Sequence, residues 1–255
     1  MEINGSTILV TGASGGLGNA MCRELAERGA NLVITARRRT LLEELAADTG
    51  AEVLVADLTD RADVRRIADR AASCDVLVAN AGVGQDPPLA ELTEESIDFS
   101  IDVNLRAPIV LAHRFATDHI AAGTPGHIVL IGSLAGMAAS PGTRMYNATK
   151  FGLRGFALSF CQELEGTVVG CTHVAPGFIR DAGMFANNDV ELPQGVRTKV
   201  PADVASGVVK AITNGPTEVF VSPPELRVAS TIGTVAPALA ALVQRKLGVS
   251  ERTGS

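Results

Sequence analysis

Short apolar runs rich in β-branched residues alternate with longer helical stretches along this 255-residue chain, and no other feature constrains the fold as strongly. Continuous apolar runs of this kind are typical of a parallel sheet that helices cover on both faces. Seven strands are predicted, at residues 7–10, 31–36, 52–57, 75–80, 127–132, 167–175 and 218–221. Helices are predicted over about residues 17–30, 40–50, 60–72, 94–121, 143–165 and 201–214.

Right-handed crossovers between such strands give a doubly wound α/β sheet, which binds ligands at the carboxyl ends of its strands. No linker, charge block or internal repeat divides the chain, so we expect one domain over residues 1–255. Two segments interrupt the alternation. Residues 181–200 follow a strand end, where we expect a substrate lid, and residues 223–247 are expected to form an apolar helical extension.

Composition limits the partners that a chain like this can have. The net charge of -6 gives no electrostatic basis for binding nucleic acid. Four cysteines and four histidines are scattered without metal-ligand spacing, so we expect reduced, buried cysteines and no metal site. The N-terminal residues lack both a basic region and a long apolar stretch, so we expect no signal peptide and a cytoplasmic protein.

The C-terminal extension contains an uncharged run from Val228 to Val243. This run is shorter than the roughly 18–20 apolar residues that span a bilayer, and we expect no transmembrane helix. Three roles stay open for the extension: a helix over the substrate pocket, a subunit contact, or a peripheral membrane contact with residues 244–246 at the lipid headgroups. The first two fit the sequence better than the third.

A glycine-rich loop, TGASGGLG at residues 11–18, connects the first predicted strand to the first predicted helix. Glycines at positions 12, 16 and 18 let the backbone approach a pyrophosphate, and the N–H groups of the helix N-terminus meet its charge. Glycines also serve plain tight turns. Because this loop is the first βα connection of a long alternating pattern, we favour a dinucleotide site.

The second predicted strand ends at Ala36, and Arg37 follows it. NAD-binding sheets usually carry an acidic residue here for the ribose hydroxyls. A carboxylate would repel the 2′-phosphate of NADP, whereas a guanidinium can bind it. We therefore favour NADP(H) over NAD(H), with a solvated arginine at a helix start as the alternative for Arg37.

Tyr146 is the only tyrosine in the chain, and Lys150 follows it by one helical turn. The two side chains would share a helix face, where an ammonium group would lower the phenol pKa from its usual value near ~10. Ser133 ends the fifth predicted strand, at the edge where substrate and cofactor should meet. The three residues together indicate proton transfer to a carbonyl oxygen.

At these positions the chain resembles the short-chain dehydrogenase/reductase (SDR) family, over about residues 5–221. The resemblance implies a Rossmann fold with a parallel seven-stranded sheet. The family motifs match TGASGGLG at 11–18, Asp57 and Leu58, ANAG at 79–82, Asn104, Ser133, Tyr146 and Lys150, and Pro176 and Gly177.

The resemblance also implies roles for these residues. Tyr146 would be the general acid and base, Ser133 would hold the carbonyl, and Lys150 would bind the nicotinamide ribose and lower the Tyr146 pKa. Asn104 would help to hold a water that relays protons to Lys150. The implied cofactor contacts are Gly12, Ser14, Gly16, Leu17, Gly18, Arg37, Asp57, Leu58, Asn80, Ala81, Gly82, Tyr146, Lys150, Pro176, Gly177 and Ile179.

Two positions depart from the family pattern. Ala79 replaces the first asparagine of the motif at residues 79–82, and Asp181 stands where a threonine usually contacts the cofactor. We expect Asp181 to turn outward or to interact with Arg180 or a base in the lid.

The sequence thus predicts an NADP-dependent oxidoreductase that interconverts a ketone or aldehyde with an alcohol on a hydrophobic or acyl-like small molecule. A non-catalytic NADP(H)-sensing protein on the same fold is the alternative, and the filled catalytic positions argue against it. The helix at 143–165 is apolar nearly all round, and SDR members commonly pair this helix, so we expect a homodimer or homotetramer.

Overall fold

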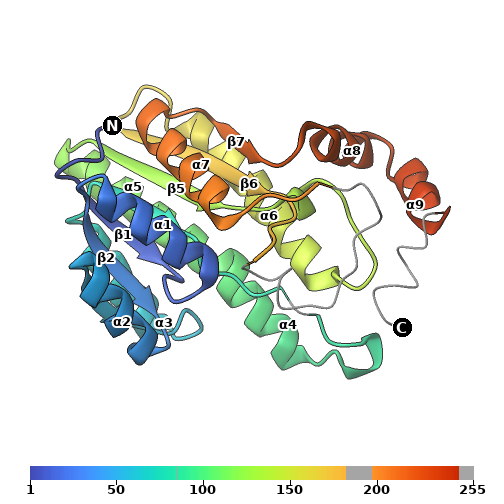
Figure 1. The fold of residues 1–255 in the computed structure, drawn as a ribbon, viewed down its shortest axis with the longest axis horizontal. Coiled ribbons are helices and arrows are strands. Elements are labelled where there is room, and N and C mark those ends of the chain that lie inside the picture. The colour runs from blue at the N-terminus through green and yellow to red at the C-terminus, as the bar shows by residue number, and fades with distance from the viewer. Residues whose placement is uncertain (85, 182–196, 247–255) are drawn as a thin grey trace.

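Seven parallel strands form one twisted sheet at the centre of the computed structural model, which describes residues 1–84, 86–181 and 197–246, without the side chains of residues 243–246 (Figure 1). The strand order is β3-β2-β1-β4-β5-β6-β7, and every pair is parallel. The strands are β1 (Thr7–Thr11), β2 (Asn31–Ala36), β3 (Glu52–Val55), β4 (Val76–Ala79), β5 (Gly126–Ile131), β6 (Val169–Pro176) and β7 (Glu218–Val221). The predicted doubly wound α/β fold is confirmed.

Helices cover both faces of the sheet. The described helices are α1 (Gly16–Glu27), α2 (Arg39–Thr49), α3 (Arg61–Ala71), α4 (Glu94–Ile101), α5 (Ala107–Ala122), α6 (Arg144–Glu163), α7 (Pro201–Asn214), α8 (Pro224–Val235) and α9 (Pro237–Lys246). One apolar core lies between the sheet and α1, α2 and α7, and a second lies between the sheet and α3, α5 and α6.

Strand residues alternate between these two cores because successive side chains of a strand point to opposite faces. In β1, Ile8 and Val10 belong to the core under α1 and α7, whereas Leu9 belongs to the core under α5. All three are fully buried. The four cysteines are buried and free, as expected.

The single helix expected over residues 94–121 is wrong in detail. The structure has α4, a π-helical turn over Asp102–Arg106, and then α5. Pro108 explains the interruption, since proline has no N–H and cannot donate to the carbonyl four residues earlier, which belongs to Asn104. π-turns inside helices often mark functional sites.

Most of the predicted lid, residues 182–196, lies outside the described residues. The two ends of this segment are joined: the Arg180 N–H donates to the Lys199 carbonyl, and the Lys199 N–H donates to the Phe178 carbonyl, each at 2.9 Å. The lid segment therefore leaves and re-enters the fold at one point, directly beyond β6.

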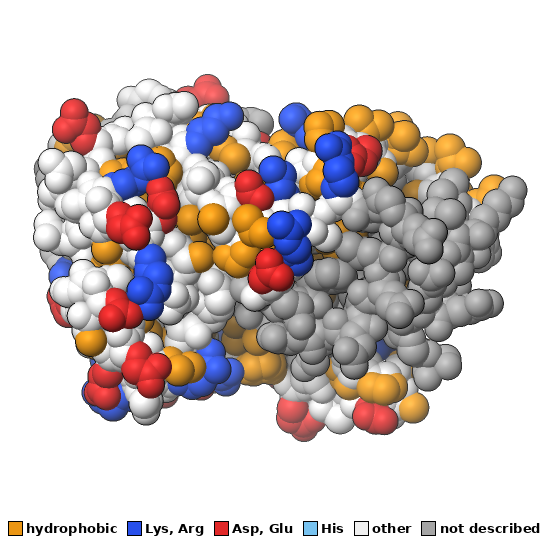
Figure 2. Space-filling model, in the orientation of Figure 1, with side chains coloured by type: hydrophobic (Ala, Val, Ile, Leu, Met, Phe, Trp, Pro, Cys, Tyr) orange, Lys and Arg blue, Asp and Glu red, His pale blue; other side chains and the backbone are white. Residues whose placement is uncertain are grey.

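Helices α8 and α9 occupy residues 224–246 of the predicted extension and lie at one end of the molecule (Figure 1). Figure 2 shows charges of both signs over the α1 and α7 side, and hydrophobic side chains gathered where α8 and α9 lie. Within the described ranges, no helix combines the length and apolar character needed to cross a bilayer.

Candidate active site

The residues predicted to bind the cofactor and to catalyse meet at the carboxyl ends of the strands. The strand order reverses between β1 and β4, because β1 continues to β2 on one side and the chain returns to β4 on the other. In open α/β sheets, ligands bind in the crevice at this switch point.

The glycine loop after β1 is shaped by contacts that only glycine permits. Gly12 has φ +68°, and a Cβ there would lie 2.7 Å from the Cα of Ala81. A Cβ on Gly18 would lie 2.3 Å from the Gly12 carbonyl oxygen. Helix α1 then begins at Gly16, with Leu17 packed against the core and with Gly15, which has no side chain, in the N-cap position. Its first N–H groups therefore suit a phosphate.

Thr11 and Asn80 hold the loops after β1 and β4 together. The Thr11 hydroxyl oxygen accepts from the N–H groups of Asn80 and Ala81, at 3.0 Å each. The Asn80 amide donates to the Thr11 carbonyl at 2.9 Å and to the Gly12 carbonyl at 3.3 Å. Ala79, where SDR proteins usually have asparagine, is a buried residue of β4.

Two arginines, Arg37 and Arg38, directly follow the end of β2. Arg37 lies 4.0 Å from Asp57 and 5.7 Å from the ring centroid of Phe99, and its side chain is 59% exposed. Arg38 donates to the Ser14 carbonyl at 2.8 Å and to the Ser14 hydroxyl at 3.3 Å. The phosphate contact was predicted for Arg37 alone, whereas Arg38 is the arginine that contacts the glycine loop.

Asp57 and Leu58 follow β3, as their motif predicts. The Asp57 carboxylate accepts from the N–H and the hydroxyl of Thr59, both at 2.9 Å, which fixes the turn after the strand. Leu58 packs against the core on the α3 and α5 face.

Tyr146 lies in the first turn of α6 with part of its surface exposed. Burial raises the pKa of its hydroxyl, and the hydroxyl of Ser133 beside it opposes the increase. The expectation that Lys150 lowers this pKa is wrong for the chain by itself. The Lys150 Nζ lies 5.7 Å from the Tyr146 ring centroid and donates to the Ile131 carbonyl at 3.0 Å.

Lys150 is 2% exposed. Burial lowers its pKa to about 8, because an ammonium group without water is costly. A Cβ on Gly82 would lie 3.7 Å from Nζ, so the loop after β4 passes directly over the amine.

The Ser133 hydroxyl oxygen accepts from the Ala135 N–H at 3.1 Å. This contact leaves its proton available for the phenol of Tyr146 or for a substrate oxygen. Ser133 directly follows Gly132 at the end of β5, as the sequence predicted.

Asn104 lies in the π-turn and is 1% exposed. Its amide oxygen accepts from the Val83 N–H, and its amide nitrogen donates to the Val83 carbonyl, both at 2.7 Å. The same nitrogen donates to the Thr149 hydroxyl at 3.2 Å. Both amide hydrogens are thus used to hold the β4 loop and α6.

Strand β6 ends at the buried Pro176, and Gly177 follows it. The Gly177 N–H donates to the Val221 carbonyl at 3.0 Å, and Ile179 is 4% exposed. Asp181 has φ +69°, uncommon for a residue other than glycine, and lies 3.4 Å from Arg180. Both alternatives for Asp181 hold, since it is exposed and paired with Arg180.

Two residues of this site escaped the sequence analysis. The amide of Asn147 accepts from the Ser140 N–H and the Thr143 hydroxyl. It donates to the carbonyls of Ala135 and Ala138, so it joins α6 to the loop after β5. Asp86, from the loop after β4, accepts from two N–H groups at the start of α6. Neither residue belongs to a motif with a sequence signal.

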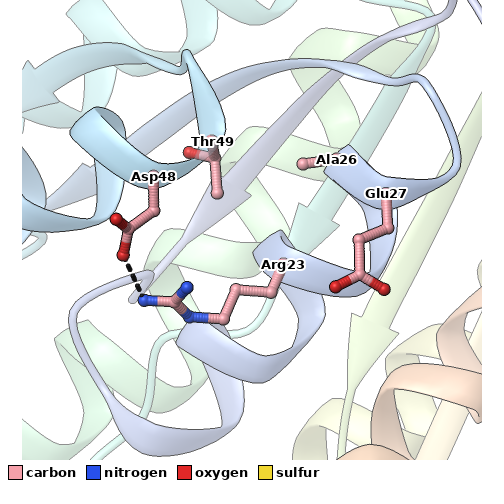
Figure 3. Close-up of a pocket in the computed structure, with 5 residues that line it drawn as sticks. All are labelled: Arg23, Ala26, Glu27, Asp48 and Thr49. Carbon is pink, nitrogen blue, oxygen red and sulfur yellow. Dashed lines mark hydrogen bonds and ion pairs between the residues drawn. The ribbon is translucent and has the colours of Figure 1, made fainter.

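A hollow of about 250 Å³ lies between α1 and α2, lined by Arg23, Ala26, Glu27, Asp48 and Thr49 (Figure 3). Its lining residues are on the last turns of these helices, which lead back to the amino ends of the strands, away from the site above. Arg23 pairs with Asp48 at 2.6 Å, and both side chains are about half exposed. Across the described ranges, no three His, Cys, Asp or Glu side chains are grouped to hold a metal ion.

Comparison with known proteins agrees with this geometry. Residues 6–192 match the family model described as short chain dehydrogenase. The 3-oxoacyl-[acyl-carrier-protein] reductase FabG of Rickettsia conorii is 33% identical over 182 residues, which are 71% of this chain and 75% of that protein. The ketoacyl reductase HetN of Nostoc sp. is 31% identical over 97% of this chain and 91% of its own length.

Solved structures share the fold over nearly the whole chain. A short-chain dehydrogenase from Sphingobium yanoikuyae in complex with NADPH has a TM-score of 0.77 and 30% identity, covering 94% of this chain and 95% of that one. The bulky-bulky ketone specific alcohol dehydrogenase from Comamonas testosteroni has a TM-score of 0.74 and 26% identity, covering 97% of this chain and 94% of that one.

Proposed function

The chain belongs to the short-chain dehydrogenase/reductase family of oxidoreductases, and we propose that it uses NADP(H) to interconvert a ketone or aldehyde with an alcohol on a hydrophobic or acyl-like substrate. The observation that carries the proposal is the placement of Tyr146 beside Ser133, with the buried Lys150 one turn along α6. These groups stand at the carboxyl edge of the sheet, next to the glycine loop.

The residues present fit a dinucleotide. Gly12 and Gly18 form a cradle that a Cβ would fill, and the N-terminus of α1 offers N–H groups to a pyrophosphate. The bound nicotinamide supplies or accepts the hydride. Asn80, Ala81 and Gly82, after β4, would line one side of this group, and Pro176, Gly177 and Ile179, at the end of β6 and beyond it, would line another.

Each catalytic residue then has one task. The Tyr146 hydroxyl gives its proton to the carbonyl oxygen in reduction and takes it back in oxidation. The Ser133 hydroxyl donates to the same oxygen and holds it near the phenol. Lys150 would bind the ribose, while Asn104 keeps the β4 loop in place over Lys150.

The preference for NADP(H) rests on Arg37 and Arg38. Arg38 contacts Ser14 of the glycine loop, Arg37 directly follows β2, and both would bind a 2′-phosphate at this end of the sheet. Similar proteins in complex with NADPH and with NADP+ support the assignment. The relatives named as ketoacyl reductases and the bulky-ketone dehydrogenase support a hydrophobic or acyl-like carbonyl substrate.

The experiment is oxidation of NADPH and of NADH over a panel of aldehydes, ketones and β-ketoacyl thioesters, with Tyr146→Phe in parallel. Turnover that prefers NADPH and is lost in Tyr146→Phe is the expected result. Tight NADPH binding without turnover on any member of the panel would instead favour the non-catalytic NADP(H)-sensing alternative.

Cofactor preference has a matched set of arginine variants. Arg37→Ala and Arg38→Ala should each raise KM for NADPH roughly 10-fold or more, since each removes a charge-assisted contact, and should leave KM for NADH nearly unchanged. Arg39→Ala is the control, because Arg39 is 67% exposed and pairs only with Glu43 on its own helix. An equal effect on both cofactors would contradict the assignment.

We also propose that α6 forms the contact of a homodimer or homotetramer. Phe151 is 38% exposed, and the rings of Phe156 and Phe160 stack at 4.9 Å while only partly buried. A helix with this much apolar surface outside the core is suited to a subunit contact. Light scattering at micromolar concentration should give a multiple of the chain mass, and a monomeric mass would contradict it.

The free, buried cysteines fit a reducing, cytoplasmic location.

A further inference from the structure

Asp86 contacts the backbone of the proposed catalytic tyrosine. Its carboxylate accepts from the Met145 N–H at 2.7 Å and from the Tyr146 N–H at 3.3 Å. Asp86 comes from the loop after β4, about sixty residues earlier in the chain. A residue of the loop after β4 therefore hydrogen-bonds to the first turn of α6.

The start of α6 needs such an acceptor. The first N–H groups of a helix have no partner within the helix, and a side-chain oxygen or a negative charge there stabilises it. Thr143, in the N-cap position, makes no side-chain hydrogen bond to the helix N–H groups. Its hydroxyl donates to the Ser140 carbonyl and to the Asn147 amide oxygen instead. Asp86 supplies the cap from a distant loop.

The same loop is held by hydrogen bonds at two further points. The Arg144 guanidinium donates to the Pro87 carbonyl, next to Asp86. At the other end of the loop, Val83 exchanges two hydrogen bonds of 2.7 Å with Asn104. Gly82 lies over Lys150. The loop thus runs from Lys150 to the backbone of Tyr146, along the side of the site where the cofactor would lie.

We propose that Asp86 is a positioning residue for Tyr146, which fixes the first turn of α6 so that the phenol stands within reach of Ser133. This inference rests on the proposed function for its effect on turnover. Misplacement of a catalytic group by about 1 Å can reduce a rate roughly 100-fold. An anchor on the backbone of the catalytic residue itself controls that placement directly.

The first test is steady-state kinetics of Asp86→Ala and Asp86→Asn. Asp86→Ala should lower kcat roughly 10- to 100-fold. The dissociation constant for NADPH, measured by its fluorescence, should stay within about twofold because no proposed cofactor contact is changed. Asp86→Asn should recover part of kcat, since the amide oxygen still accepts from one N–H. Asp98→Ala is the matched control, because Asp98 is exposed on α4.

The second test does not require turnover. The chain has one tyrosine and no tryptophan, so its phenolate absorbance in a pH titration reports Tyr146 alone. In Asp86→Ala the titration midpoint should fall, because the loosened first turn admits water to a phenol whose pKa is raised by burial. The other charged groups next to this turn, Arg144 and Lys150, are unchanged. Tyr146→Phe should show no titration at all.

The outcomes separate the two proposals. If wild type turns over and Asp86→Ala matches it in both kcat and phenol midpoint, the positioning role is wrong and the proposed function stands. If wild type shows no turnover on the panel but the midpoint still falls in Asp86→Ala, the proposed function fails and the positioning role stands. Loss of NADPH binding in proportion to kcat would also overturn the positioning role.

Discussion

Lys150 places an ammonium group where water is almost excluded. It is 2% exposed, and burial lowers its pKa from 10.5 to about 8. Between these two values the folded chain binds fewer protons than the unfolded chain, so the stability of the cofactor-free protein should rise with pH across this window. Below pH 8 the charged amine destabilises the folded state by about 3 kcal/mol, which is the free-energy equivalent of its pKa shift.

We predict that Lys150→Met makes the cofactor-free protein more stable at pH 7, by about 1–2 kcal/mol, because it replaces a buried charge with an apolar side chain of similar length. Turnover should be lost at the same time. Urea unfolding of both proteins at pH 7 and pH 10 is the measurement. The gain should shrink at pH 10, and a variant less stable than wild type at pH 7 would contradict the argument.

Gly12 has a backbone conformation and a close neighbour that both exclude a side chain. We predict that Gly12→Ala costs about 1–3 kcal/mol of stability, since it strains φ +68° and forces a Cβ against the Ala81 backbone. NADPH binding should be abolished with it. Gly155→Ala is the control in the NADPH titration, because Gly155 lies within α6, away from the glycine loop. Thermal unfolding and fluorescence titration with NADPH measure both effects.

The π-turn between α4 and α5 shows how one proline shapes an element. Pro108 cannot donate to the Asn104 carbonyl, and the helix widens by one residue at this point. The widened turn directs the Asn104 amide to Val83, away from the helix axis. A local sequence signal therefore determines a contact with a different loop.

We predict that Pro108→Ala lowers kcat about 10-fold or more with little loss of stability, because residue 108 would regain an N–H and could complete a regular α-helical turn. The hydrogen bonds between Asn104 and Val83 would weaken as a result. Kinetics test the expected loss of kcat, and thermal unfolding of the same preparation tests the expected small change in stability. Unchanged kcat would show that the π-turn does not depend on Pro108.

A partly buried cluster of Arg154, His173 and Glu218 connects α6 to the last two strands. Glu218 of β7 accepts from Arg154 of α6 at 2.8 Å and from His173 of β6 at 2.9 Å. Burial by itself would raise the pKa of Glu218, but the hydrogen bonds from His173 and Arg154 outweigh it and lower this pKa to about 2. Arg154 lies one turn beyond Lys150, so the cluster anchors the catalytic helix.

We predict that Glu218→Gln costs about 2–3 kcal/mol at pH 7, because it removes the charge that the cluster stabilises. The folded-state pKa is depressed, so this contribution is complete above pH 4.5 and is lost as pH falls toward 2. The urea midpoints of wild type and variant should therefore converge as the pH is lowered from 7 to 3. Glu225→Gln is the control: its pair with Arg197 is solvent-exposed and should contribute little.

At the scale of the molecule, α8 links the C-terminal extension to the catalytic half. The Thr234 hydroxyl donates to the Met137 carbonyl at 2.7 Å, and a Cβ on Gly233 would lie 2.9 Å from that of Ala138. The loop after β5, which carries Ser133, is thus supported from behind by α8. The outer surface of α8 and α9 carries exposed apolar side chains at Val228, Ile232, Val235, Leu239 and Leu242 (Figure 2).

We predict that deletion of residues 224–255 lowers kcat/KM for bulky apolar carbonyls more than for small ones, because the loop after β5 loses its support. Deletion of residues 237–255 alone keeps α8 and should leave this ratio unchanged. Both truncated proteins are compared with full-length chain by kinetics and light scattering. An equal loss from the two deletions would assign the effect to α9 or beyond.

Particular residues show which parts of the fold and of the site can be predicted from local sequence. All seven strands were located to within about two residues, because a buried parallel strand is a local apolar run. Gly12 and Ser133 follow strand ends that the pattern defines, and Tyr146 and Lys150 lie in the first turns of the next helix; topology brings them to one edge. The long helix at 94–121 was wrong because its apolar pattern continues through a turn that Pro108 opens.

The sequence by itself determined the sheet, the nucleotide loop and the residues that stand at the strand ends, since each depends on short-range periodicity or on a motif of fixed spacing. Only the tertiary structure decided which groups act on Tyr146. The carboxylate of Asp86, the amide of Asn147 and the burial that raises the tyrosine pKa all depend on how separate elements pack. Contacts between residues far apart in the chain, and the exclusion of water that follows from them, leave no local pattern to recognise.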